Sequence, residues 1–256
     1  MISLDTLLEF HTNQGTSTIP PSDGYIAVTD TVDAPALFVL FHYVQLAIQS
    51  GRPVVWIDGS GNGRTHLHSI ARRSLCSTFT YVETSDESLA PLLDQVDASL
   101  ADTDSTETAT ALVIVDDLSV LSWRHSNTAP WVIALRNKRA ALITLSHVDA
   151  TCATTKGASL DDTDESLFRF ILHTADLWVS VKQLSSGRAA DCDGEIAVHQ
   201  LSRPAAAESD PALSSYRLVR SFGAASPCLY RIATTGVGAL GSRPTLRIWA
   251  RGTGLT

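Results

Sequence analysis

Short apolar runs alternate along most of the chain with stretches in which apolar residues recur every three or four positions. Runs of the first kind predict strands buried on both faces, and stretches of the second kind predict amphipathic helices. The expected strands are residues 25–29, 53–57, 79–82, 111–115 and 140–145. The expected helices are residues 37–48, 84–100, 130–135 and 167–172. Strands that alternate with helices in this way predict a parallel sheet with helices on both faces.

Three local signals mark the expected ends of these helices. Gly51 follows the first helix at the position where a left-handed residue closes a helix. Thr84 and Glu87 have the spacing of a capping box. Pro130 suits the first turn of a helix, where no backbone N–H is needed.

The pattern changes after Asp176. Apolar runs at 177–181 and 195–198 are separated only by turn residues, which predicts antiparallel strands. Residues 216–219, 229–232 and 246–249 are expected to add short strands. The order favours a RecA-like three-layer α/β/α fold, with a mostly parallel sheet and antiparallel strands at its C-terminal end, over a dinucleotide-binding fold. We expect an N-terminal segment (1–22), a RecA-like core (23–201), and a C-terminal insertion with short strands packing on the same domain (202–256).

Charge is unevenly distributed along this chain of 256 residues and net charge -8. Ten acids and no Lys or Arg lie between Arg73 and Arg124. From Arg203 onward the sequence contains seven arginines and only two acids. These stretches are either solvated faces or surfaces that meet complementary subunits or, for the tail, nucleic acid. The net charge argues against a large nucleic-acid surface. The four cysteines lie far apart without a C-x-x-C pair, which predicts reduced thiols in a cytosolic protein.

The loop after the first strand lacks the chemistry of a nucleotide-binding protein. A RecA-like ATPase carries G-x-x-x-x-G-K-(S/T) there, with amides and a lysine that hold phosphates. Residues 29–35 contain neither Gly nor Lys. They contain Asp30 and Asp33, whose charges oppose a triphosphate, and Pro35, which has no N–H. The RecA-like fold therefore has a degenerate P-loop, and Asp30 or Asp33 is expected to cap the following helix.

A second loop, residues 58–65, differs from a P-loop motif at two positions, with Asp58 for the first Gly and Arg64 for the Lys. Arginine is a poor geometric substitute for that lysine. A turn at the edge of the sheet is the favoured interpretation, and nucleotide binding is the alternative. Asp116 and Asp117 resemble a Walker B strand end, although an acid that caps or forms a salt bridge explains them better. We expect no catalytic residue, cofactor or metal; the nucleotide site of the alternative would use Gly61, Gly63, Arg64, Thr65 and Asp116.

Four stretches carry a resemblance to one known family through their order and spacing, although each is weak alone. The stretches are residues 25–30 with 37–43, residues 51–57 with 66–73, residues 111–118, and residues 175–179 with 184–187 and 193–196. Across about residues 23–201 they resemble the family of Elongator complex protein 6, a subunit of the eukaryotic Elongator complex.

The resemblance implies a non-catalytic RecA-like subunit without a working P-loop. It implies assembly with Elongator proteins 4 and 5 into a heterohexameric ring, accessory to the subcomplex that modifies the wobble uridine of tRNA. The family ring is associated with ATP hydrolysis and tRNA release. The implied location is the cytoplasm, with the nucleus as a second compartment, and no membrane.

By analogy with RecA-like rings, the segment from His147 to Asp162 is either a pore loop near tRNA or a simple surface loop. His147 and Lys156 are its candidate contacts. Arg124, Arg136 and Arg139 are candidates for a contact with a neighbouring subunit.

Two other functions stay open from the sequence. One is a P-loop-variant NTPase that uses residues 59–65. The other is a different inactive RecA-like adaptor, such as a recombination mediator or a KaiC-like relative. The partners that the chain binds would separate this last class from Elongator.

Overall fold

The structure is a computed structural model of the chain, and the statements below concern the residues that it describes. These are residues 2–12, 15–21, 24–59, 61, 79–84, 88–101, 111–138, 140–148, 162–184, 186, 189, 191–201, 217–218, 227–233 and 245–250.

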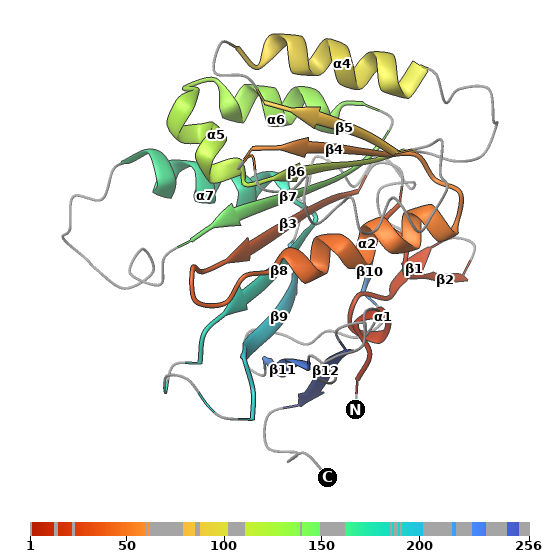
Figure 1. The fold of residues 1–256 in the computed structure, drawn as a ribbon, viewed down its shortest axis with the longest axis vertical. Coiled ribbons are helices and arrows are strands. Elements are labelled where there is room, and N and C mark those ends of the chain that lie inside the picture. Colours follow the sequence, from red (N-terminus) through yellow and green to blue (C-terminus); the bar gives the residue numbers. More distant parts are fainter. Residues whose placement is uncertain are drawn as a thin grey trace, which may run out of the picture.

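A nine-stranded sheet with the order β12-β11-β9-β8-β3-β7-β6-β4-β5 forms the centre of the molecule (Figure 1). The six strands from β8 to β5 are parallel, and β9, β11 and β12 continue the sheet with antiparallel pairing. The expected mostly parallel α/β sheet with antiparallel C-terminal strands is confirmed. The strands are β3 (Tyr25–Asp30), β4 (Val54–Asp58), β5 (Phe79–Glu83), β6 (Leu112–Asp116), β7 (Ala141–His147), β8 (Leu177–Lys182), β9 (Gly194–Gln200), β11 (Cys228–Ala233) and β12 (Thr245–Ala250).

Helices cover both faces of this sheet (Figure 1). Alternate residues of a strand point to opposite faces, so Val54 and Trp56 of β4 enter one core while Val55 and Ile57 enter the other. The first core packs against α2, and the second packs against α4, α5, α6 and α7. The helices are α2 (Leu37–Gln49), α4 (Ala90–Ala101), α5 (Leu118–Arg124), α6 (Thr128–Arg136) and α7 (Asp162–Thr174). No helix within the described residues is long and apolar enough to cross a bilayer.

The N-terminal residues form a small addition to this core. Helix α1 (Leu4–Leu7) precedes β1 (Phe10–Thr12) and β2 (Gly15–Ser17), which join β10 (Arg217–Leu218) in a sheet of order β10-β1-β2. The short strand expected near residue 217 is therefore present, but it pairs with β1 and not with the main sheet. The boundaries at residues 22 and 201 stay a prediction, and the insertion at 202–215 lies outside the described residues.

The helix-end signals have mixed outcomes. Gly51 has a φ of +73° after α2, as expected of a residue that closes a helix. The capping box is wrong: α4 begins at Ala90, and the Thr84 hydroxyl donates to the Asp58 carbonyl (2.9 Å). Glu87 lies outside the described residues. Pro130 is the third residue of α6 and not its first, and α5 was not expected.

Candidate functional site at the carboxyl edge of the sheet

The carboxyl ends of four adjacent strands, β3, β7, β6 and β4, bring five ionisable side chains to one edge. β3 leads into α2 on one face, and its neighbour β7 is followed along the chain by α7 on the other face. In open α/β sheets, ligands bind at the carboxyl edge where the connections diverge in this way. The residues at these strand ends are Asp30, Asp58, Asp116, Asp117 and His147.

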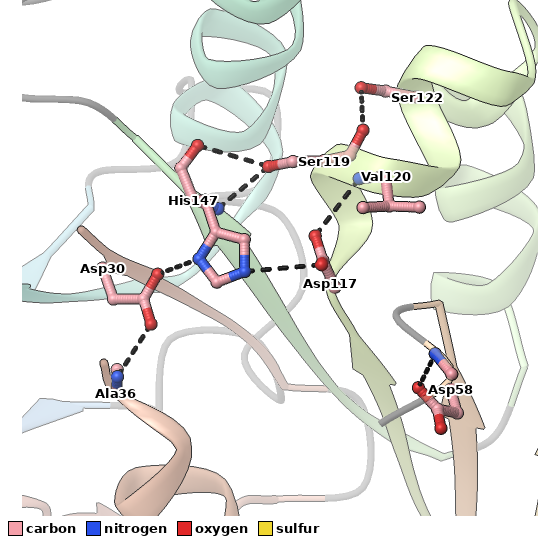
Figure 2. Close-up of polar contacts among 9 residues, drawn as sticks. Asp30, Ala36, Asp58, Asp117, Ser119, Val120, Ser122 and His147 are labelled. Atoms are coloured by element: carbon pink, nitrogen blue, oxygen red, sulfur yellow. Dashed lines mark hydrogen bonds and ion pairs between the residues drawn. The ribbon is translucent and has the colours of Figure 1, made fainter. Parts of the chain in front are cut away.

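In the bend between β3 and α2, a carboxylate at the end of the strand binds a backbone amide at the start of the helix. Residues 31–34 form a tight turn in which the Ala34 N–H donates to the Thr31 carbonyl (3.0 Å). The Asp30 carboxylate, 2% exposed, accepts a hydrogen bond from the N–H of Ala36, which immediately precedes α2 (2.7 Å; Figure 2). The N-cap residue of α2 is Ala36, which has no side-chain cap, so the expectation that Asp30 or Asp33 is the N-cap is wrong. Asp30 instead binds the amide of that N-cap residue. An amide that a P-loop offers to phosphate is bound to a carboxylate of the same chain.

His147 is the cation of this edge. Its Nδ1 is paired with Asp30, and its Nε2 lies 3.4 Å from a carboxylate oxygen of Asp117 (Figure 2). Hydrogen bonds to Asp117 and to Asp30 raise the pKa of His147 to about 10, against the opposing effect of its burial. The imidazolium is therefore charged at neutral pH, and its charge is held between two strand ends of its own chain.

Asp117 both caps a helix and carries part of this ion pair. Its φ of 60° is left-handed, a conformation in which Asp is tolerated better than most residues. Its carboxylate accepts from the N–H of Val120 (3.1 Å) at the start of α5. The hydroxyl of Ser119, the residue before Val120, accepts a hydrogen bond from the backbone N–H of His147 (2.9 Å; Figure 2). This bond connects α5 to the end of β7. Asp117 thus has both structural roles that the sequence favoured over metal binding.

Asp116 lies beside these groups and is 5% exposed. Burial is the main cause that raises its pKa to about 7, followed by the charges of Asp58 and Asp117, while His147 acts in the opposite direction. Among the described residues, four carboxyl groups thus lie at this edge with one imidazolium, which is paired with Asp30 and Asp117. Within the described residues, no group of three or more His, Cys, Asp or Glu side chains is placed to hold a metal ion.

Two glycines of the loop at residues 58–65 are required by the backbone geometry around them. The Gly59 N–H donates to the Asp116 carbonyl (2.8 Å), and a Cβ on Gly59 would lie 2.6 Å from the carbonyl oxygens of both Asp116 and Asp117. Gly61 has a φ of +74°, which favours glycine. Both glycines are explained without a phosphate.

The carboxylate of Asp58 binds a backbone amide of the loop that follows it. One oxygen accepts from the Gly61 N–H (2.8 Å), and the other accepts from the Tyr81 hydroxyl. A negative charge therefore takes the backbone N–H that an anion would use. The remaining candidates of this loop, Gly63, Arg64 and Thr65, lie outside the described residues.

The structure separates the other candidates. Arg136 lies at the opposite edge of the sheet, where it donates to the Thr174 carbonyl and to Asp176 (3.3 Å). Arg124 is exposed in the last turn of α5. Arg139 and Lys156 lie outside the described residues. Sequence reasoning missed Ser119 and Tyr81, whose contacts depend on strand neighbours far away in the chain.

The mostly parallel sheet, its antiparallel C-terminal strands and its two helical layers define a RecA-like and KaiC-like α/β fold. The chain is similar in fold to the KaiC-like protein PH0186 of the hyperthermophilic archaeon Pyrococcus horikoshii, with a TM-score of 0.58 and 10% identity over 97% of this chain and 96% of that one. The model of the Elongation complex protein 6 family matches residues 64–218, more than half of the chain, so the chain belongs to that family. The comparison with curated proteins found no match.

The family match covers only part of the acidic edge. Asp116, Asp117 and His147 lie within the matched residues, whereas Asp30 and Asp58 precede them. The β3–α2 bend therefore lies outside the part of the chain that the family model matches.

Proposed function

We propose that the chain is a non-catalytic RecA-like subunit of the Elongator accessory ring, in which it assembles with Elongator proteins 4 and 5 into a heterohexamer. In this role it supports the modification of the wobble uridine of tRNA. The observation that carries the non-catalytic part is the hydrogen bond from the Ala36 N–H to the Asp30 carboxylate at the helix terminus where a RecA-like ATPase holds phosphate.

Electrostatics supports the same conclusion. A phosphate oxygen about 4 Å from one carboxylate would meet a repulsion of roughly 4 kcal/mol at an effective dielectric constant of ~20. In the part of this edge that the structure describes there are four carboxyl groups, and the one imidazolium there is already paired with Asp30 and Asp117. Those residues therefore leave no cation to offset the charge of a triphosphate.

The alternative, a P-loop-variant NTPase, has less support. Its loop would have to release Gly61 from the Asp58 carboxylate before that amide met a phosphate. Asp116, the acid that would hold the magnesium ion of the nucleotide, has a pKa of about 7 and so is partly protonated at neutral pH.

Membership of the Elongation complex protein 6 family supports the assembly part of the proposal. A subunit without its own nucleotide site contributes by shape, contacting neighbours that do the chemistry. We place the protein where Elongator acts, in the cytoplasm and, as a second compartment, the nucleus.

Reconstitution tests this function. The chain is co-expressed with Elongator proteins 4 and 5, and the mass of the complex is measured by light scattering or native mass spectrometry. We expect a heterohexamer, and we expect Arg64→Ala to leave both its assembly and its ATP hydrolysis unchanged. A wild-type chain that stays monomeric in this mixture would contradict the assembly. Loss of ATP hydrolysis in an intact Arg64→Ala ring would favour the NTPase.

A further inference from the structure

Two arginines face each other at the far end of the main sheet. Arg231 of β11 is directly opposite Arg247 of β12 in the antiparallel ladder, and both side chains are exposed. Residues in this relation have Cβ atoms about 4.5–5.5 Å apart, and like charges there are destabilising. The repulsion between the two arginines therefore slightly lowers the stability of the free chain.

Neither guanidinium has a hydrogen bond or an ion pair with the residues that the structure describes. The acid beside them, Asp193, accepts a hydrogen bond from the N–H of Ile232 (2.6 Å). Burial and then the neighbouring acids, Asp193 among them, raise the pKa of Cys192, whereas the positive charge of Arg231 lowers it. The two arginines thus present paired donors to the outside of the molecule.

An apolar cluster lies beside the two arginines on the same face of the sheet. On the same face of the sheet, two residues before Arg231 and two after Arg247, Leu229 faces Trp249. These two side chains belong to a small apolar cluster with Leu184 and Cys192. Figure 1 shows β11 and β12 at the end of the sheet opposite α4. These apolar side chains pack within the chain itself, since Trp249 is 7% and Leu184 9% exposed and Leu229 is partly buried against them. The two exposed guanidinium groups are therefore what this part of the face offers to a partner.

We propose that Arg231 and Arg247 form a docking site for a carboxylate-rich segment of a neighbouring subunit. The inference rests on the proposed function, because it assigns one face of this chain to a contact within the Elongator assembly. Each planar guanidinium binds a carboxylate with two parallel hydrogen bonds, which the ammonium group of lysine does not do. Two of them side by side suit consecutive acidic side chains of an extended or looped segment.

A protein segment fits this surface better than nucleic acid does. The chain has a net charge of -8, and Asp191 and Asp193 are exposed next to the pair. A polyanion that tracks many phosphates would meet these charges along its length. A short acidic segment needs only the two guanidinium groups.

The charge could instead serve only to keep an end strand from aggregating, a task for which lysine is as good as arginine. The two roles differ in their response to substitution. A docking site loses affinity when Arg231 and Arg247 are both changed to lysine, and loses more when both are changed to glutamine. A protective charge is preserved by lysine and leaves affinity unchanged.

The experiment measures the affinity of labelled chain for recombinant Elongator proteins 4 and 5 by fluorescence anisotropy at several salt concentrations. We expect the double glutamine variant to bind at least tenfold more weakly, with a smaller dependence on salt, and the double lysine variant to lie in between. The matched control is Arg169→Gln, which removes an exposed arginine paired with Glu165 on α7, and we expect it to bind like wild type. Thermal unfolding of the free double variants should show no loss of stability, since a like-charge pair is removed or kept.

Several results would overturn the assignment. Equal affinity of the wild type and the double glutamine variant would remove this docking site while leaving the proposed function in place. A wild-type chain that fails to bind proteins 4 and 5 would refute the proposed function and this inference together. Binding of a uridine-rich RNA oligonucleotide that depends on the two arginines, or self-association that depends on them in sedimentation, would assign the pair to another occupant.

Discussion

The substitution His147→Gln tests the ionic centre of the acidic edge. Glutamine keeps a hydrogen-bonding side chain of similar reach but removes the charge between Asp30 and Asp117. An imidazole whose pKa rises from 6.5 to about 10 on folding contributes about 4 kcal/mol at pH 7 by linkage. The side chain is 38% exposed, and solvent screening reduces this to roughly 2 kcal/mol.

The sign of the pH dependence follows from the raised pKa. Histidine gains a proton more easily in the folded chain, so its contribution is fully present below pH 6.5 and is lost as the pH rises through about 10. Urea unfolding of the wild type and His147→Gln should therefore show the largest difference near pH 6, and less than half of it at pH 9. His173→Gln, at an exposed position in the last turn of α7, is the control and should show little difference at either pH. A difference for His147→Gln that is constant between pH 6 and pH 9 would refute the assignment of the charge.

The remaining predictions concern the same edge and the opposite one. Asp116→Asn should raise the free energy of unfolding by about 2 kcal/mol at pH 8. A carboxyl whose pKa is raised from 3.8 to about 7 by folding opposes folding as the pH rises above 3.8, and this cost is complete above about pH 7. In urea unfolding the gain should therefore shrink at pH 4.5, and an equal gain at both values would count against it. Gly59→Ala should lower the free energy of unfolding by at least about 2 kcal/mol, because the new Cβ would meet two carbonyl oxygens at 2.6 Å. Gly61→Ala should lower it by only about 1 kcal/mol, because Gly61 has a positive φ but open space around it. Denaturant midpoints in the reverse order would contradict this packing. Arg136→Gln should lower the free energy of unfolding by about 2 kcal/mol in the same assay. Arg124→Gln, at an exposed position, should change it by less than about 0.5 kcal/mol. Equal losses for the two variants would show that the contacts of Arg136 do not stabilise the fold.

The strands of the main sheet were predictable because parallel strands buried on both faces appear as unbroken apolar runs. Helix α5 escaped prediction because it has only seven residues, too few to show a helical period, and begins after Asp117 in a left-handed conformation. The strands β1 and β2 have three residues each and contain His, Thr, Gly and Ser, so they carry no alternating apolar pattern.

The acids of the candidate site were predictable because each follows an apolar run and the carboxyl ends of parallel strands meet at one edge. What the sequence does not show is which acids share the histidine. The pairing of His147 with Asp30 joins residues 117 positions apart, and it depends on β7 lying next to β3. The sequence associated His147 with a loop near tRNA, a role that stays a prediction, while the structure places it at the end of a strand.

The most direct measurement is a titration of the isolated chain with ATP and Mg²⁺, followed by calorimetry and thermal unfolding. A ligand present at 100 times its dissociation constant stabilises a protein by about 2.7 kcal/mol, so binding at the β3–α2 bend would be visible as a clear rise in melting temperature. We predict no saturable heat and no rise at millimolar nucleotide, because Asp30 already holds the Ala36 amide. Saturable binding that Asp30→Asn strengthens, with phosphates located at that bend, would contradict the account.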